Sequence, residues 1–254
     1  MILLMGGTSE TAGIAWALAE QGGWQTLIST ATDAPLELPQ HPLLEKRQGR
    51  LDRHELAALI RQRGIRLVVD ATHPFAVIAH ESARAAAAEA DIPCLRWERQ
   101  RDDYAHEGIT FVDSHGQAAE LAARSGINVL LTTGSRNLLP YVMAFQGSTA
   151  RLYARVLPHA ESMRACEEAQ LPAECVIAER GPFSVEQTMA LIIEKQIGLL
   201  VSKDSGAAGG VPEKLEAARR CGCRVIMIRR PESIPGVSVL DDLVFAVRMA
   251  FGQS

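Results

Sequence analysis

The sequence predicts an α/β protein built from two Rossmann-like lobes, each with a parallel sheet, and a cleft between them. Short apolar segments typical of strands alternate with helical segments along nearly the whole chain, which is the pattern of parallel α/β sheets. Turns rich in glycine, hydroxyl and charged residues follow several of those strands, where open α/β sheets bind ligands. A chain of 254 residues with 47% hydrophobic residues can form one large or two modest cores.

The individual elements follow from the hydrophobic pattern and from the turn residues that bound each segment. The expected strands are 2–5, 24–29, 66–70, 94–97, 128–132, 152–156, 175–178, 199–202 and 225–228. The expected helices are 11–21, 54–63, 75–90, 117–124, 137–145, 161–169, 185–194, 213–220 and 241–251. The charged segment 98–108 and the proline-containing segment 230–236 interrupt this alternation. We therefore expect lobes at 1–105 and 106–254, and the pattern leaves open whether the last helix returns to the first lobe.

Composition and charge argue against several classes of protein. The net charge of −4 and the pI near 6.0 give no general attraction for nucleic acid or anionic membranes. The five cysteines are scattered, without the paired spacing of a zinc or redox site, which predicts reduced thiols and no metal site. Residues 1–5 fit a first strand better than a signal peptide, and no later apolar run is long enough to cross a bilayer. We expect a cytoplasmic protein, with a monomer as the favoured oligomeric state.

The segment 67–76 is the most informative part of the sequence. Its apolar run ends in Asp70, Ala71, Thr72, His73 and Pro74, so it predicts a buried parallel strand that delivers polar groups to a ligand-binding edge. Pro74 suits the first turn of the following helix, where its missing N–H is not needed. The alternative is an ordinary strand–loop–helix connection in which Thr72 is a cap and His73 bonds to the backbone.

The turn after the first expected strand has the position of a dinucleotide-binding loop. Gly6 and Gly7 allow a tight turn and close approach of the backbone, and the following helix offers N–H groups and its positive dipole end to a phosphate. The spacing departs from G-x-G-x-x-G, because Thr8 and Ser9 occupy the loop and the later glycine is Gly13. The two hydroxyls can bind a pyrophosphate or simply cap the helix.

The end of the second expected strand bears on the choice between the two nicotinamide cofactors. An NAD site usually presents a carboxylate there to the ribose, whereas this strand ends in Ser29 and Thr30 and the first carboxylate is Asp33. A 2′-phosphate would therefore not be repelled. Arg47 and Arg50 follow and are candidate phosphate ligands, although two solvated surface arginines would look the same.

Two turns in the second half carry further polar groups. Residues 132–137 follow an apolar strand and open a helix with hydroxyls, backbone N–H groups and Arg136, which suits carboxylates or phosphates. Lys203 and Asp204 stand side by side at the end of another strand, before a glycine-rich segment, and provide a cation, a carboxylate and a mobile backbone. A well-capped helix start and a structural ion pair are the alternative interpretations.

Motifs at these turns share an order along the chain. They are residues 4–10 (LMGGTSE), 69–76 (VDATHPFA), 132–138 (TTGSRNL), 181–184 (GPFS) and 202–206 (SKDSG), the last followed by Gly209, Gly210, Glu213 and Lys214. In this set and this order the chain resembles the precorrin-6A reductase family over nearly its whole length.

The resemblance implies NADPH-dependent reduction of a double bond in precorrin-6A, a ring-contracted tetrapyrrole on the route to vitamin B12, to give precorrin-6B. Acetate and propionate arms make this substrate a polyanion, which explains why Arg136 and Lys203 would be gathered at one site on an acidic protein. The nicotinamide would supply hydride, and His73, Lys203 and Asp204 are the candidate proton donors beside water and the macrocycle itself. The cobalt complex of the substrate is the alternative to the metal-free form.

The expected site residues divide between the lobes. Those assigned to NADPH lie in the first lobe and are Gly6, Gly7, Thr8, Ser9, Glu10, Ser29, Thr30 and Thr72. Those assigned to the tetrapyrrole lie in the second and are Thr133, Gly134, Ser135, Arg136, Ser202, Ser205, Gly206, Gly209 and Gly210.

Other functions have less support from the sequence. A short-chain or nucleotide-sugar reductase would share the Gly-Gly-Thr start, but the Tyr-x-x-x-Lys pair of short-chain enzymes is absent around Tyr104, Tyr141 and Tyr153. Tyr141 and Tyr153 fit packing positions with a polar tip better than proton donors. A regulatory protein that senses NADPH would leave the polar loops of the second lobe without a role.

Overall fold

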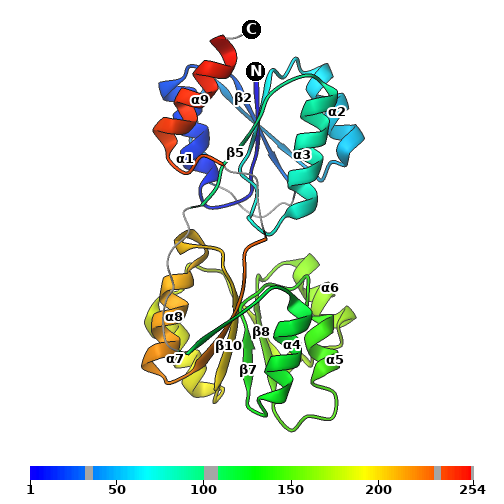
Figure 1. Cartoon of the computed structure of the whole chain (residues 1–254), viewed down its shortest axis with the longest axis vertical. Helices are drawn as coiled ribbons and strands as arrows, with labels where there is room; N and C mark the ends of the chain where they lie inside the picture. The colour runs from blue at the N-terminus through cyan, green and yellow to red at the C-terminus, as the bar shows by residue number, and fades with distance from the viewer. Residues whose placement is uncertain (32–36, 100–107, 232–235, 253–254) are drawn as a thin grey trace. The chain divides into compact units, whose positions relative to one another are not determined.

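The computed structural model describes residues 1–31, 37–99, 108–231 and 236–252. The chain forms two compact units, of which unit 1 comprises residues 1–100 and 231–254 and unit 2 comprises residues 101–230. Each unit is a parallel sheet with helices on both faces (Figure 1), which confirms the predicted fold class of two Rossmann-like lobes. The sequence-based division runs the second lobe to residue 254, whereas in the structure the chain returns to unit 1 at residue 231.

Unit 1 is built on a sheet with the strand order β3-β2-β1-β4-β5, in which all neighbouring pairs are parallel. Its strands are β1 (Ile2–Met5), β2 (Thr26–Thr30), β3 (Leu44–Gln48), β4 (Leu67–Asp70) and β5 (Cys94–Arg96). Its helices are α1 (Thr11–Trp16), which continues as the π-helix η1 (Ala17–Gln21), α2 (Arg53–Gln62), α3 (Val77–Glu89) and α9 (Leu240–Gly252).

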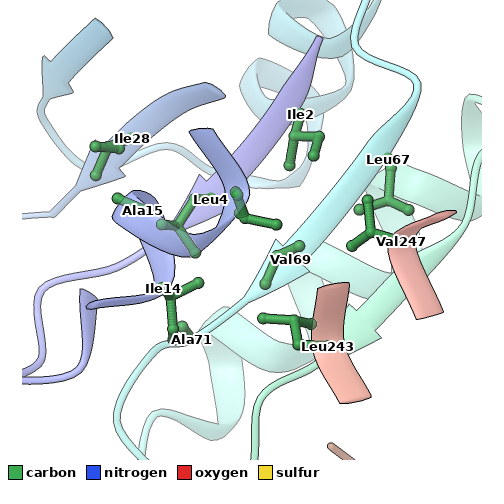
Figure 2. Packing of buried hydrophobic residues seen from close by; sticks show 11 residues of the cluster. Ile2, Leu4, Ile14, Ala15, Ile28, Leu67, Val69, Ala71, Leu243 and Val247 are labelled. Atoms are coloured by element: carbon green, nitrogen blue, oxygen red, sulfur yellow. The ribbon is translucent and has the colours of Figure 1, made fainter. Parts of the chain in front are cut away.

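The alternation of side chains along β1 explains why this sheet is covered on both faces. Ile2 and Leu4 pack into a core with α1 and with Leu243 and Val247 of α9 (Figure 2), whereas Leu3 packs on the opposite face against α2 and α3. All three β1 side chains are fully buried. The last helix of the chain is therefore part of the unit 1 core.

Unit 2 has the strand order β6-β11-β10-β7-β8-β9, again with every pair parallel. Its strands are β6 (Ile109–Val112), β7 (Val129–Leu131), β8 (Leu152–Val156), β9 (Val176–Ala178), β10 (Leu199–Lys203) and β11 (Arg224–Ile228). Its helices are α4 (His115–Arg124), α5 (Leu139–Ala144), α6 (Ala160–Glu168), α7 (Val185–Glu194) and α8 (Val211–Arg220), with short 3₁₀ turns η2 (Ala173–Cys175) and η3 (Ala207–Gly209). Figure 1 shows α4 and α5 on one face of this sheet and α7 and α8 on the other.

Each sheet contains one point at which the strand order reverses. In unit 1 the chain proceeds outward from β1 through β2 and β3, and in the opposite direction from β4 to β5. In unit 2 it proceeds from β7 to β8 and β9, and in the opposite direction from β10 to β11. Ligands of open α/β sheets bind outside the carboxyl ends of the strands at such a switch point. The turns after β1, β4, β7 and β10 are therefore the ones to examine.

The sequence prediction missed two edge strands. Residues 44–48 read LEKRQ, and their side chains are mostly exposed in β3, which lies at the edge of the sheet and pairs with β2 alone. The other, β6, is also an edge strand, paired with β11 alone. Edge strands need no continuous apolar run, so the hydrophobic pattern does not reveal them.

The expected position of Pro74 in a helix was wrong. Helix α3 begins at Val77 and its N-cap is Ala76, so Pro74 lies in the preceding turn. That turn is held by local bonds, because the N–H of Phe75 donates to Nδ1 of His73 at 3.2 Å and the N–H of Ala76 donates to the carbonyl of His73 at 2.8 Å. Residues 73–76 therefore form a turn, and the helix begins three residues after Pro74.

None of the helices in the described ranges combines the length and the apolar character that a membrane span requires.

Candidate functional site

The turn after β1 is organised by Thr11, a residue that the sequence analysis did not single out. The fully buried Thr11 hydroxyl accepts hydrogen bonds from the N–H groups of Gly7 at 3.0 Å and Thr8 at 3.1 Å. Gly6 is required here, because a Cβ at this position would lie 2.4 Å from Cγ2 of Thr11. Gly7 has φ +107° and nothing within 4 Å of the position of a Cβ, so its free side is open to a ligand.

The hydroxyls of this turn have partners in the protein. Thr8 Oγ1 donates to the carbonyl of Ala71 at 3.2 Å, which ties the β1 turn to the end of β4 across the switch point. Ser9 Oγ donates to Glu10 at 3.0 Å. The α1 N-cap, Glu10, makes no side-chain cap bond, so Thr8 and Ser9 do not cap this helix as the sequence allowed.

Glu10 forms an ion pair with Arg99, which follows strand β5. Arg99 binds both carboxylate oxygens, with Nη2 2.8 Å from Oε2, and both side chains are largely buried. Burial opposes ionisation of Glu10, but the Arg99 hydrogen bond and charge outweigh it, so the Glu10 pKa is lowered. This pairing gives the predicted cofactor residue Glu10 a role in holding the turn.

Ser29 and Arg47 meet at the carboxyl ends of β2 and β3. The two residues are cross-strand partners, and Arg47 Nη1 donates to Ser29 Oγ at 2.7 Å and to the carbonyl of Gly49 at 2.9 Å. Thr30 is buried beside them at the end of β2. A hydroxyl and a guanidinium therefore stand where a dinucleotide-binding sheet meets the adenosine ribose. Arg50 is exposed and follows β3.

Asp70 forms the centre of a buried polar network at the end of β4. Its carboxylate accepts from Thr72 Oγ1 at 2.7 Å, lies 2.8 Å from His80 Nδ1 and lies 3.0 Å from Arg96 Nη1. Burial raises the Asp70 pKa, but the His80 hydrogen bond and the charges of Arg96 and His80 exceed that effect, so the net pKa is lowered. Arg96 Nη1 also donates to the carbonyls of Asp70 and Thr72, which fixes the backbone of the turn.

His73 lies in this turn and points its Nδ1 at the N–H of Phe75. Because Nδ1 accepts that bond, the proton of a neutral His73 ring is on Nε2. In the neutral ring, Nε2 of His73 is therefore a hydrogen-bond donor and not an acceptor. Its ring also packs 5.9 Å from that of Phe75.

In unit 2 the turns after β7 and β10 flank the switch point. Thr132 Oγ1 donates to the carbonyl of Val201 at 3.0 Å, which ties the start of the turn after β7 to strand β10. Thr133 is buried and its hydroxyl has no hydrogen-bond partner among the described residues, whereas the Arg136 side chain is 68% exposed and lies 4.0 Å from Glu161. Gly134 has φ +81°, which places Ser135 and Arg136 beyond a tight turn.

The charge of Lys203 acts on His115, the half-buried first residue of α4, and His115 in turn contacts Tyr141 of α5. Burial, and then the charge of Arg136, lowers the Lys203 pKa to about 8. Burial, and then the charge of Lys203, lowers the His115 pKa to about 4. His115 Nδ1 lies 3.0 Å from the hydroxyl of the fully buried Tyr141. Tyr141 is thus a packing residue with a polar tip, and its neighbour His115 is neutral near pH 7.

The side chain of Asp204 lies near Arg230. Its Oδ1 lies 3.5 Å from Nη2 of the buried Arg230, and its carbonyl accepts from Arg230 Nε at 3.2 Å. Ser205 is buried and bends back to the carbonyl of Lys203 through its N–H at 2.7 Å. Gly206 and Gly210 both have positive φ, at 74° and 68°, so the segment between β10 and α8 depends on its glycines.

Across the described residues, histidine, cysteine, aspartate and glutamate side chains form no group that could hold a metal ion.

Comparison with known proteins identifies the family. The family model described as precorrin-6x reductase CbiJ/CobK matches residues 1–248. The chain belongs to the precorrin-6x reductase family. It is 36% identical over 251 residues to the cobalt-precorrin-6A reductase of Priestia megaterium, covering 97% of this chain and 98% of the relative. It is 32% identical over 252 residues to the precorrin-6A reductase of Rhodococcus erythropolis, covering 97% and 95%.

A solved structure supports the same assignment. The structure described as CobK precorrin-6A reductase superposes with a TM-score of 0.79 at 27% sequence identity, covering 98% of this chain and 96% of that chain. Both units are thus part of the fold of precorrin-6x reductases. The resemblance inferred from the motifs is confirmed.

Several site residues of this precorrin-6x reductase lie outside the motifs. Thr11, His80, Arg96 and Arg99 contact motif residues but come from helices, from a strand end or from the segment after β5, and His115 interacts with the charge of Lys203. Thr11, His80 and Arg96 could have been suspected only as polar residues inside helical or strand patterns, and Arg99 is one of several charged residues in the segment 98–108. Their partners are set by the sheet order, which the sequence pattern does not give.

Proposed function

We propose that this protein uses NADPH to reduce the precorrin-6A macrocycle to precorrin-6B. The observation that carries the proposal is the family match over nearly the whole chain, together with the placement of four family motifs at the two switch points. Relatives of both names, for the cobalt complex and for the metal-free form, align over nearly the full length. Both forms of the substrate therefore enter the test.

The β1 turn of unit 1 fits a dinucleotide. The open side of Gly7 and the N-terminal end of α1 would receive the pyrophosphate, while Ser29 and Arg47 would receive the 2′-phosphate of NADPH. When bound, the nicotinamide supplies a hydride to the macrocycle. Thr11 would hold the turn after β1, and the Asp70 network would hold the turn after β4, in the positions that face this ligand.

The turns of unit 2 fit a polycarboxylate. The Lys203 ammonium and the exposed Arg136 guanidinium would bind acetate or propionate arms, and the Thr133 hydroxyl is a buried donor without a partner among the described residues. The segment from Ser205 to Gly210 would approach the ring edge through its backbone. An acidic protein can hold this anion because the positive charges are local.

The proton that accompanies hydride transfer has three candidate donors in the chain. Lys203 is the best placed chemically, since its pKa of about 8 lets the ammonium give up a proton near neutral pH. His73 could donate the proton only as the imidazolium, through the Nε2 that does not face Phe75, because a neutral imidazole N–H is a very weak acid. Asp204 is the third candidate, and its carboxylate lies 3.5 Å from the buried Arg230 guanidinium.

The experiment is an NADPH oxidation assay with the purified protein. We expect NADPH to be consumed only when precorrin-6A or cobalt-precorrin-6A is present, and the tetrapyrrole product to gain one hydride and one proton. A matched control replaces the tetrapyrrole with a nucleotide sugar or a simple ketone, for which no consumption is expected. Oxidation of NADPH with the control substrates alone would refute the proposal.

A further inference from the structure

The face of unit 2 that is opposite Lys203 holds a second group of cations that the proposed function does not use. Val201, Leu131 and Ala154 lie side by side in register across β10, β7 and β8. Ser202 and Arg155 each follow one of these residues, so both side chains project from the same, opposite face of the sheet. Arg155 Nη1 contacts Thr188 Oγ1 at 3.4 Å, which identifies this face as the one covered by α7.

Arg155 is buried, and the protein uses only part of its hydrogen-bonding capacity. Its side chain is only 5% exposed, and its Nε makes no hydrogen bond, although Glu179 lies 3.5 Å away with a half-exposed side chain. The ring of Phe183 stands 4.0 Å from the guanidinium carbon. Phe183 belongs to the 181–184 motif, whose last residue, Ser184, caps α7. The motif therefore holds the guanidinium in place at the carboxyl end of β8.

Lys214 brings another cation to the same face from the first turns of α8. Its Nζ donates to the carbonyl of Gly209 at 2.7 Å, so the ammonium lies at the glycine-rich segment that follows β10. Burial, and then the positive charges of Arg155 and Lys203, lower the Lys214 pKa to about 8, against the opposing charge of Glu213. The positive charges near Lys214 therefore outweigh the nearby carboxylate of Glu213.

Ser202 adds a hydroxyl on the same face of the sheet, on β10, two strands away from Arg155 on β8. Ser202 is 1% exposed, and its Oγ has no hydrogen-bond partner in the described part of the chain. A buried hydroxyl without a partner costs stability unless a ligand or water satisfies it. Two cations and one unsatisfied hydroxyl at the ligand edge of a parallel sheet are the donor set that a carboxylate requires.

We propose that Arg155, Lys214 and Ser202 form a subsite for one acetate arm of the macrocycle, on the α7 and α8 face of the unit 2 sheet. The inference rests on the proposed function for the identity of the ligand, and it extends the substrate site beyond the turns of β7 and β10. The subsite assigns a role to the 181–184 motif and to Lys214, which family resemblance alone left without one.

The test measures binding of two soluble tetrapyrroles by their own fluorescence. Uroporphyrin carries an acetate arm wherever coproporphyrin carries a methyl group, so the ratio of their dissociation constants reports carboxylate recognition. We expect Lys214→Met and Arg155→Met to weaken uroporphyrin binding by about tenfold or more, the loss of a charged hydrogen bond. Coproporphyrin binding should change less, and NADPH binding should not change. Arg219→Met, which removes an exposed cation from the same helix, is the matched control.

Two further variants separate recognition of an anion from support of the loop. Lys214→Gln can still donate to the Gly209 carbonyl but carries no charge, so it should bind uroporphyrin as poorly as Lys214→Met. Ser202→Ala removes only the unsatisfied hydroxyl, and we expect a folded protein with uroporphyrin binding several-fold weaker. Wild-type affinity in Lys214→Gln, or unchanged uroporphyrin-to-coproporphyrin ratios in all variants, would overturn the subsite. The NADPH oxidation assay of the wild type judges the reductase proposal separately.

Discussion

Replacing Thr11 by valine tests whether the β1 turn is pre-formed for a dinucleotide. Valine keeps the shape of the fully buried side chain but removes the oxygen that accepts the N–H groups of Gly7 and Thr8. The bond from Thr8 Oγ1 to the Ala71 carbonyl does not involve Thr11 and should remain. The change therefore acts on the two amides at the open side of the turn.

The size of the effect follows from those two amides. An unsatisfied buried donor costs about 1–3 kcal/mol, and because this turn is half-buried we take about 2 kcal/mol for the pair. If that energy disfavours the binding conformation of the turn, the dissociation constant for NADPH rises about 30-fold, since each 1.4 kcal/mol is a factor of ten. Thr11→Ser keeps the hydroxyl and loses one methyl group, so it is the matched control.

The assay is NADPH titration followed by fluorescence of the reduced nicotinamide, with thermal melting of each variant. We expect Thr11→Val to bind NADPH about 30-fold more weakly and Thr11→Ser to bind it like the wild type even if its melting temperature falls. Wild-type affinity in Thr11→Val would show that the turn does not need this acceptor and would refute the reasoning.

Three further predictions concern the cofactor, the substrate and the Asp70 network. Arg47→Gln should lower the preference for NADPH over NADH by about tenfold or more in steady-state efficiency, whereas Lys46→Gln, an exposed cation on the same strand, should not; an unchanged preference would remove Arg47 from the site. Since the Lys203 ammonium loses its proton above pH about 8, kcat/KM for the tetrapyrrole should fall above that pH, and Lys203→Ala should abolish the fall; a fall that survives the substitution would point to another group. Asp70→Asn should destabilise unit 1 by about 3–5 kcal/mol near pH 7, because it leaves Arg96 and His80 without their buried anion. The Asp70 pKa is lowered in the folded state, so the stabilisation by Asp70 is present above the unfolded pKa and is lost as pH falls through the folded pKa. In denaturant unfolding, the free energies of unfolding of the variant and the wild type should therefore converge in acid. A difference in stability that stays constant with pH would contradict this prediction.

Much of the fold was predictable because the central strands of both sheets are continuous apolar runs. The runs that became β1, β4, β7 and β10 are buried on both faces, and their ends were placed within one or two residues. The polar edge strand β3 was not predictable, because its exposed side chains show neither an apolar run nor alternation.

The missing strand had a consequence for the site. Arg47 could be suspected as a phosphate ligand but could not be placed, because only its pairing in β3 sets it against Ser29. In the same way the sequence identified Asp70, but not His80 and Arg96, whose approach depends on α3 and on β5 lying next to β4. Residues on one turn can be grouped from sequence, whereas residues brought together by sheet order cannot.

The most direct measurement of the proposed reaction follows the hydride itself. NADPH deuterated at the transferable position is incubated with the purified protein and with precorrin-6A or its cobalt complex, and the tetrapyrrole product is analysed by mass spectrometry and NMR. We expect deuterium from the labelled NADPH at one ring carbon of the product. When unlabelled NADPH is used in deuterated water, we expect no deuterium at that carbon. A reduced macrocycle without deuterium from NADPH, or no reduction of either form, would contradict the proposed function.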